Sequence, residues 1–186
     1  ILGAMTQCSM LHVQGQRLCV ERAADVMSVL TTTSPNYLLM ASLDAARAQV
    51  QVRGKEMAEA AVSAANKLRN VCSKYVGLKL LTEADCGGLK LDTTKVTVNF
   101  AEWGYTGIEA GELFRKAGIA VELVDAQNVL FLVTYADVTE DYQEALAKID
   151  KVLAQMEQGK KSKEQAVKAQ AVPVTEMALP LREVFY

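Results

Sequence analysis

The sequence has few of the residues that build metal sites and disulfide frameworks. Its 186 residues include one histidine, three prolines and four cysteines, Cys8, Cys19, Cys72 and Cys86. No two cysteines form a CxxC pair, and the usual Cys/His zinc spacings are absent. We therefore expect buried thiols in a protein of a reducing compartment rather than zinc ligands.

Long hydrophobic runs and an excess of one charge are also lacking. The longest dense apolar run, Val129 to Val133, is far too short to cross a bilayer, so no membrane span is expected. Lysine and arginine number 20 against 22 aspartates and glutamates, which leaves a formal charge of -2 and no broad basic field for nucleic acid. The first residues lack the basic region and cleavage-like site of a secretory signal and include no initiator methionine, so we expect the chain to begin inside a longer sequence.

The composition that remains is that of a globular protein. A hydrophobic fraction of 51% excludes wholesale disorder, and the length suits one domain or slightly more. Near the start, Met10 to Val13 fits a buried strand, and Val20 to Leu30 fits a short helix. Ser34 and Pro35 then predict a helix start, with serine as the N-cap and proline as the first helical residue.

Two helices are predicted in succession after this start. The first covers 36–52 and carries small residues that suggest close packing. Gly54 is expected to interrupt the helical pattern, and a second helix should run from Lys55 to Tyr75 with Gly77 as its stop. Together the two helices would connect two lobes of the protein.

Residues 95–156 predict a compact α+β module. Val96, Val98 and Phe100 alternate with polar residues, as in a half-buried strand. Thr106 and Glu109 form a capping box that opens a helix. Further strands are expected over 119–123 and 129–135, and a last helix capped by Thr139 should follow. The lysine-containing stretch 159–171 suits a solvated helix or linker, and an extended tail follows it.

Few residues outside these elements suggest chemistry. Cys8 and His12 lie four apart, but their surroundings predict a strand, so a core histidine is favoured over a nucleophile–base pair. Four carboxylates in turns or on exposed faces are expected to be structural: Asp85, Asp92, Glu102 and Glu109. The hydroxyls of 31–34 leave two interpretations open, a phosphate site at a helix start and a plain helix cap, and the residues alone favour the cap.

Several segments resemble the Orn/Lys/Arg decarboxylases, pyridoxal-phosphate enzymes of fold type I. LTTTSPNYLLMASLDAARAQV (30–50) is similar to a signature of that family, and GAMTQCSMLHVQG (3–15) resembles the stretch after its cofactor lysine. KVTVNFAEWGYTGIEAGELF (95–114), AVELVDAQNVLFLVTYADVTED (120–141) and the final ALPLREVFY resemble later segments in the same order. The likeness covers nearly the whole chain, and its first motif is quite specific.

This resemblance implies an α/β fold and a division of the chain. Residues 1–34 would be the end of the large domain that binds pyridoxal phosphate, and 35–77 would be connecting helices. Residues 78–157 would form an α+β small domain, and 158–186 a linker with the start of a C-terminal region. The family's Ser-x-His-Lys motif, whose lysine holds the cofactor, is expected just before Ile1, so no catalytic residue is expected in the chain and the chain alone should be inactive.

The resemblance also implies function and partners. It predicts a lyase of polyamine biosynthesis, which releases carbon dioxide from arginine, lysine or ornithine with pyridoxal 5'-phosphate. Thr32, Thr33 and Ser34 would contact the phosphate of the neighbouring subunit's cofactor, and Gln7 and Ser9 would lie near the active site. The expected partners are a basic amino acid and a second subunit in a homodimer or higher oligomer with shared active sites, without nucleic acid or membrane.

Two other interpretations and the location stay open at this stage. A non-catalytic structural or regulatory subunit would keep the fold and lack the lysine. A free-standing α+β ligand-binding domain over 78–156 would fold alone. The expected location is the cytoplasm, with a plastid as the alternative.

Overall fold

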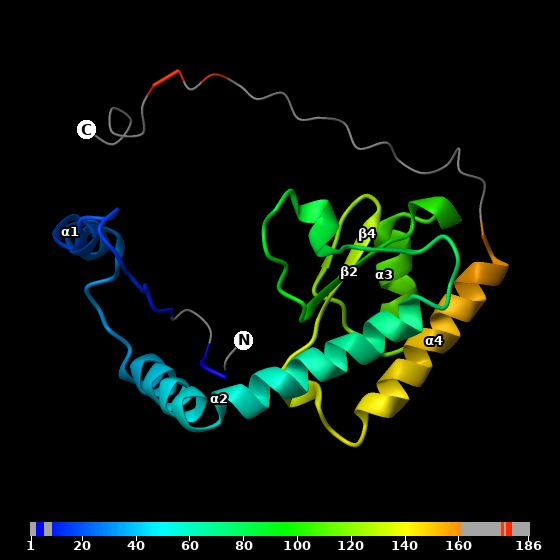
Figure 1. Ribbon diagram of the computed structural model, residues 1–186, viewed down its shortest axis with the longest axis horizontal. Helices are drawn as coiled ribbons and strands as arrows, with labels where there is room; N and C mark the ends of the chain where they lie inside the picture. The colour runs from blue at the N-terminus through cyan, green and yellow to red at the C-terminus, as the bar shows by residue number, and fades with distance from the viewer. Residues whose placement is uncertain (1–2, 6–8, 161–175, 177, 180–186) are drawn as a thin grey trace. The chain divides into compact units, whose positions relative to one another are not determined.

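The computed structural model describes residues 3–5, 9–160, 176, 178 and 179 (Figure 1). Their chain contacts divide them into two units, which are described separately. The described residues of 1–64 and 133–139 form the first unit, and those of 65–132 and 140–186 form the second. Most of the predicted linker and C-terminal region, 158–186, lies outside the described residues.

The second unit contains a four-stranded antiparallel sheet with helices beside it (Figure 1). The strand order is β1-β2-β4-β3, and β4 pairs with its neighbours on both sides. In the central pair, Val98 lies opposite Val129. This combination of helices and antiparallel sheet is compatible with the expected α/β class. The strands are β1 (Lys79–Leu80), β2 (Lys95–Asn99), β3 (Leu123–Val124) and β4 (Asn128–Leu132).

The two central strands bury one face of the sheet. Val96 and Val98 of β2 are fully buried, and Val129 and Phe131 of β4 lie on the same buried face. The predicted alternation in β2 is confirmed. Strand β4, however, ends at Leu132, before the end of the strand predicted over 129–135. Only every second residue of β4 is buried, because the other face of the sheet is partly open.

The strand expected over 119–123 is much shorter than predicted. Only Leu123 and Val124 pair with β4. The preceding residues complete the end of helix α3, where the backbone N–H of Ile119 donates to the carbonyl of Phe114 and Gly118 adopts a φ of 79°. The backbone first bonds to β4 at Glu122, whose N–H donates to the carbonyl of Leu130 at 2.9 Å, and β3 follows directly.

Helices α3 (Gly107–Lys116) and α4 (Tyr142–Gln158) supply much of the core. The capping box of α3 is confirmed, since Thr106 and Glu109 exchange side-chain-to-backbone hydrogen bonds of 3.1 and 2.9 Å. Phe114 of α3 contacts Phe100 and Phe131 edge-on. Helix α4 does not have the predicted Thr139 cap, because it begins two residues later, after Asp141. The buried side chains of α4 are Leu146, Ile149, Val152, Leu153 and Met156.

Helix α2 (Tyr37–Cys72) is one continuous helix, not the predicted two. Gly54 lies within it without breaking it. A single glycine costs a helix only about 1 kcal/mol relative to alanine. One ion pair crosses this position, since Arg53 bridges Glu56 at 2.9 Å, and Lys55 bridges Glu59 in the turn that follows at 3.9 Å.

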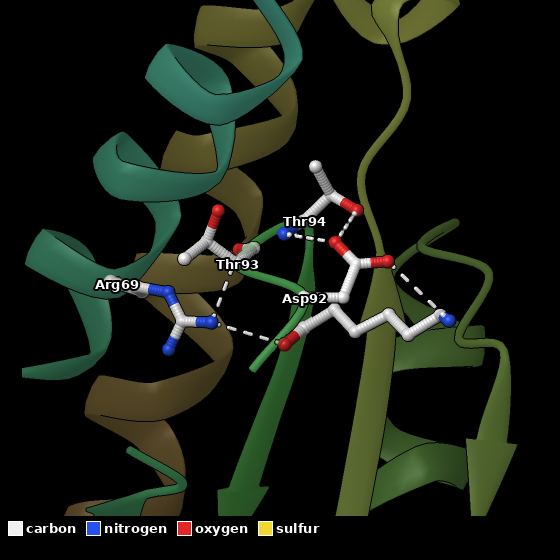
Figure 2. Close-up of polar contacts among 5 residues, drawn as sticks. Arg69, Asp92, Thr93 and Thr94 are labelled. Atoms are coloured by element: carbon white, nitrogen blue, oxygen red, sulfur yellow. Dashed lines mark hydrogen bonds and ion pairs between the residues drawn. The ribbon is translucent and has the colours of Figure 1, made fainter. Parts of the chain in front are cut away.

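In the second unit, the end of α2 fastens the 81–95 loop through Arg69 (Figure 2). The Arg69 guanidinium donates to the carbonyl oxygens of Thr93 and Lys95 at 3.1 and 3.0 Å, and to that of Leu81 at 3.3 Å. Both ends of the loop are therefore held by one side chain. Charged donors make stronger hydrogen bonds than neutral ones, which makes Arg69 a main organiser of this loop. No sequence motif pointed to this role.

The first unit buries little of its apolar surface. Helix α1 (Val20–Leu30) forms where predicted, but none of its residues is buried. The strand predicted over 10–13 is absent from this part of the structure, and His12 is exposed instead of lying in a core. A short 3-10 turn, η3 (Tyr135–Asp137), belongs to the same unit.

Candidate functional site

The segment between α1 and α2 carries the hydroxyls that the sequence singled out. Helix α1 ends when Thr31 turns back on it, with its backbone N–H and its hydroxyl both donating to the carbonyl of Met27 at 2.9 and 2.6 Å. Thr31 itself has an extended backbone, with φ -88° and ψ 152°. Thr31 therefore ends the helix, and its β-branched side chain disfavours helical continuation.

The N-cap of α2 is Asn36, and the predicted Ser34–Pro35 start is wrong. The Asn36 side-chain oxygen accepts hydrogen bonds from the backbone N–H groups of Leu38 and Leu39, at 3.0 and 3.3 Å. Asparagine is among the strongest N-cap residues. Sequence reasoning missed it because Ser-Pro gave an equally familiar signal two positions earlier.

Because Asn36 caps α2, the hydroxyls of residues 32–34 precede the helix and do not cap it. Thr32, Thr33 and Ser34 are all exposed. The Thr32 hydroxyl accepts a hydrogen bond from the backbone N–H of Ser34 at 3.2 Å. Within the described part of the chain, the hydroxyls of Thr33 and Ser34 have no hydrogen-bond partner. They are accessible donors for an anion at this point of the chain.

The donor set fits one end of pyridoxal phosphate. Hydroxyl groups are suitable donors to the oxygens of a phosphate. The ring end requires a lysine for the aldehyde, and the sequence has none before Lys55. The segment Thr32–Ser34 therefore suits the phosphate and leaves the ring to other residues.

Of the two remaining predicted site residues, Gln7 and Ser9, the structure describes Ser9 alone. Gln7 lies outside the described residues, as does Cys8. Ser9 is exposed, and no hydrogen bond among the described residues links it to Thr32–Ser34. Nearby, the backbone N–H of Met5 donates to the hydroxyl of Ser42 at 3.1 Å, which ties the N-terminal segment to α2.

The four carboxylates have structural contacts, as predicted. Asp85 caps a 3-10 turn (η1, Glu83–Cys86), and hydrogen bonds from Thr82 lower its pKa. The pKa of Asp92 is lowered mainly by a hydrogen bond from Thr94. Glu102 bridges Lys79 at 2.9 Å, and Glu109 belongs to the capping box of α3.

No metal centre and no membrane span is found in the part of the chain that the structure describes. No group of three or more histidine, cysteine or acidic side chains there could hold a metal ion. No described helix combines the length and hydrophobicity that a membrane crossing requires. The prediction of buried thiols holds for Cys72, whereas Cys19 is exposed and Cys86 is half-buried.

Comparison with known proteins identifies the family to which this segment is similar. Residues 1–91, which include Thr32–Ser34, match the family model described as Orn/Lys/Arg decarboxylase, major domain. The chain belongs to the Orn/Lys/Arg decarboxylase family. Two relatives bear the name arginine decarboxylase, one from Bacillus anthracis at 33% identity and one from Bacillus subtilis (strain 168) at 30%. Each alignment covers 82% of this chain and 32% of the relative.

A further relative in this family has no function in its name. The uncharacterized protein YaaO from Bacillus subtilis is 29% identical over 160 residues. Its alignment covers 81% of this chain and 31% of that protein. The chain thus spans about a third of the length of the curated relatives it matches.

Proposed function

We propose that this chain is a segment of a pyridoxal-phosphate-dependent decarboxylase that acts on a basic amino acid, with arginine as the first substrate to test. The observation that carries the proposal is the 33% identity to a protein named arginine decarboxylase, sustained over 82% of the chain. The family match over 1–91 supports the same reaction class. The product of such a lyase would be an amine that can enter polyamine synthesis.

The chain's own contribution would be to hold the cofactor by its phosphate. When bound, pyridoxal phosphate supplies the electron-withdrawing ring that lets carbon dioxide leave the α-carbon of an amino acid. The hydroxyls of Thr33 and Ser34 would donate to the phosphate, and Thr32 would support their backbone. Such contacts fix the orientation of the ring relative to the substrate. The cofactor-binding lysine is assigned to no residue of this chain.

The proposal includes a homodimer in which Thr32–Ser34 serves the neighbouring subunit's cofactor. Its support is the apolar surface of the first unit. Val29 and Leu30 of α1 are 75% and 77% exposed, and Leu38 of α2 is 74% exposed. Exposed apolar residues in such number usually mark an interface. Gln7 and Ser9 are proposed to lie near the active site in this assembly.

We expect the full-length protein that contains this sequence to release carbon dioxide from arginine when supplied with pyridoxal phosphate. The measurement is the initial rate of product formation with arginine, lysine and ornithine compared in parallel. An initial rate with arginine far above the rates with lysine and ornithine would identify arginine as the substrate. Absence of turnover with all three amino acids, in protein that demonstrably binds the cofactor, would overturn the decarboxylase proposal.

The phosphate contact is tested by removing the two unpartnered hydroxyls together. Thr33→Val combined with Ser34→Ala should weaken cofactor binding about 100-fold or more, because two hydrogen bonds are lost and each hydrogen bond to a charged group contributes roughly 1.5–3 kcal/mol. The measurement is titration of cofactor-free full-length protein with pyridoxal phosphate, followed by absorbance. Ser63→Ala, an exposed serine within α2, is the matched control. Equal affinities of the double variant and the control would remove Thr33 and Ser34 from the site.

A further inference from the structure

A groove in the second unit lies between α3 and α4 and has no part in the proposed function. Its volume is about 600 Å³. Its apolar lining comes from both helices: Leu113, Ala117, Val152 and Met156. Val152 and Met156 are almost fully buried, whereas Leu113 and Ala117 are half-buried. The groove therefore has a packed base and an accessible apolar wall.

The rim of this groove is cationic. Lys116 of α3 and Lys148 and Lys151 of α4 line it, and no carboxylate is among the lining residues. Lys148 is paired with Glu144 at 2.7 Å along the same helix. Within the described residues, Lys116 and Lys151 form no ion pair, although Lys116, after Arg115, helps to lower the pKa of Glu112. An occupant that carries negative charge would gain favourable interactions along this rim.

The spacing of the rim residues matches the period of a helix. Lys148, Lys151 and Gln155 follow one another at intervals of three and four along α4, so they lie on one face of that helix. At one end, the Tyr105 hydroxyl donates to the carbonyl oxygen of Gly159 at 2.9 Å, which holds Tyr105 against the end of α4. The lining thus combines an apolar strip with polar groups repeated about every helical turn.

We propose that this groove binds an acidic amphipathic helix of a partner protein. Apolar side chains at i and i+4 of the partner would fill the strip, and flanking Asp or Glu residues would reach Lys116 and Lys151. A small molecule fits this groove less well, because small-molecule sites usually enclose most of their ligand, whereas Leu113 and Ala117 stay half-exposed along the wall.

The test uses two synthetic peptides that differ only in charge. Each is a helix of about 18 residues, long enough to be helical on binding, with leucine at i and i+4 and either glutamate or lysine flanking positions. We expect the glutamate peptide to bind the full-length protein that contains this sequence at least about tenfold more tightly than the lysine peptide, a difference of about 1.4 kcal/mol. Binding is followed by fluorescence anisotropy, and amide NMR shifts should locate it at 113–117 and 148–156.

A matched pair of charge reversals locates the site independently. Lys151→Glu should weaken binding of the glutamate peptide by about tenfold. Lys67→Glu reverses an exposed lysine of α2 outside the groove and should leave binding unchanged. Thermal unfolding of both variants checks that they remain folded. Equal binding of the two peptides, or an equal effect of the two reversals, would overturn the proposal. Octanoate is the probe for a small apolar ligand, and its binding in the groove when neither peptide binds would also overturn the proposal.

Discussion

Replacing Gly107 by alanine is expected to destabilise the second unit by about 3 kcal/mol or more, because overpacking against fixed backbone is at the costly end of core substitutions. A Cβ at Gly107 would overlap the carbonyl oxygen of Asn128 and would lie 2.5 Å from that of Asp125. Both obstacles are backbone atoms, so no side-chain rotation can relieve the clash. The first turn of α3 and the turn before β4 would have to separate.

The turn that opposes Gly107 is itself held in place. The Asp125 carboxylate accepts hydrogen bonds from the backbone N–H groups of Gln127 and Asn128, at 2.8 and 2.7 Å. The Asn128 side chain also accepts one from Asn99 of β2 at 2.8 Å. Moving this turn would break several hydrogen bonds together, which is why the expected loss exceeds that of an ordinary surface glycine.

The measurement is urea unfolding followed by the fluorescence of Trp103, the single tryptophan, which is buried in the second unit. Gly118→Ala at the other end of α3 is the control. Gly118 has a φ of 79°, and a methyl group added there would have no neighbouring atom within 4 Å, so its loss should be only about 1 kcal/mol from backbone strain. Equal losses in both variants would show that the close approach at Gly107 is not the cause.

The parts of the fold that were predictable from sequence depend on neighbouring residues. The capping box of Thr106 and Glu109 and the alternation in β2 are set within a few positions. Local hydrogen bonds and a period of two therefore identify them without knowledge of the rest. The bounds of α1 were predictable for the same reason, since the threonines after Leu30 disfavour helix.

The errors arose where two local signals competed or where an effect was small. Asn36 and Ser34 are both good N-caps, and only the structure shows that Asn36 is the one used. Gly54 signals a helix end, but its cost is small compared with the hydrogen bonds of a 36-residue helix. Arg69 joins three carbonyls from distant parts of the sequence, and no local pattern could have revealed that.

The candidate site was found through family resemblance rather than through physical chemistry. The residues alone favoured a plain helix cap at 31–34. The structure gives the cap to Asn36 and leaves Thr33 and Ser34 exposed, which removes the structural explanation for their hydroxyls. The groups that would hold the cofactor ring cannot be predicted from this segment, because a ring contact depends on residues brought together by the tertiary fold and the assembly.

The stability of the second unit should fall with rising pH between about 9 and 12, because burial raises the pKa of the Cys72 thiol from 9.0 to about 12. In the unfolded chain the thiol ionises near its ordinary pKa of 9.0, so between pH 9 and 12 the unfolded state holds fewer protons than the folded state. The stabilisation is fully present below pH 9 and is lost as pH rises toward 12, with a slope of at most about 1.4 kcal/mol per pH unit. Tyr75 adds to the same trend, since burial and then a hydrogen bond to Asp150 raise its pKa to about 12.

The measurement is the urea midpoint of wild type, Cys72→Ala and Cys86→Ala across this pH range. Cys72→Ala should lower stability below pH 9 because it leaves a cavity. It should also flatten the alkaline slope because it removes the titrating group, so its stability should approach that of wild type as pH rises toward 12. Cys86→Ala, which removes a half-buried thiol, is the control variant. A wild-type slope in Cys72→Ala would exclude the buried thiol as the source. The slope is the deciding quantity, since a purely structural effect of the cavity lowers stability by the same amount at all pH values.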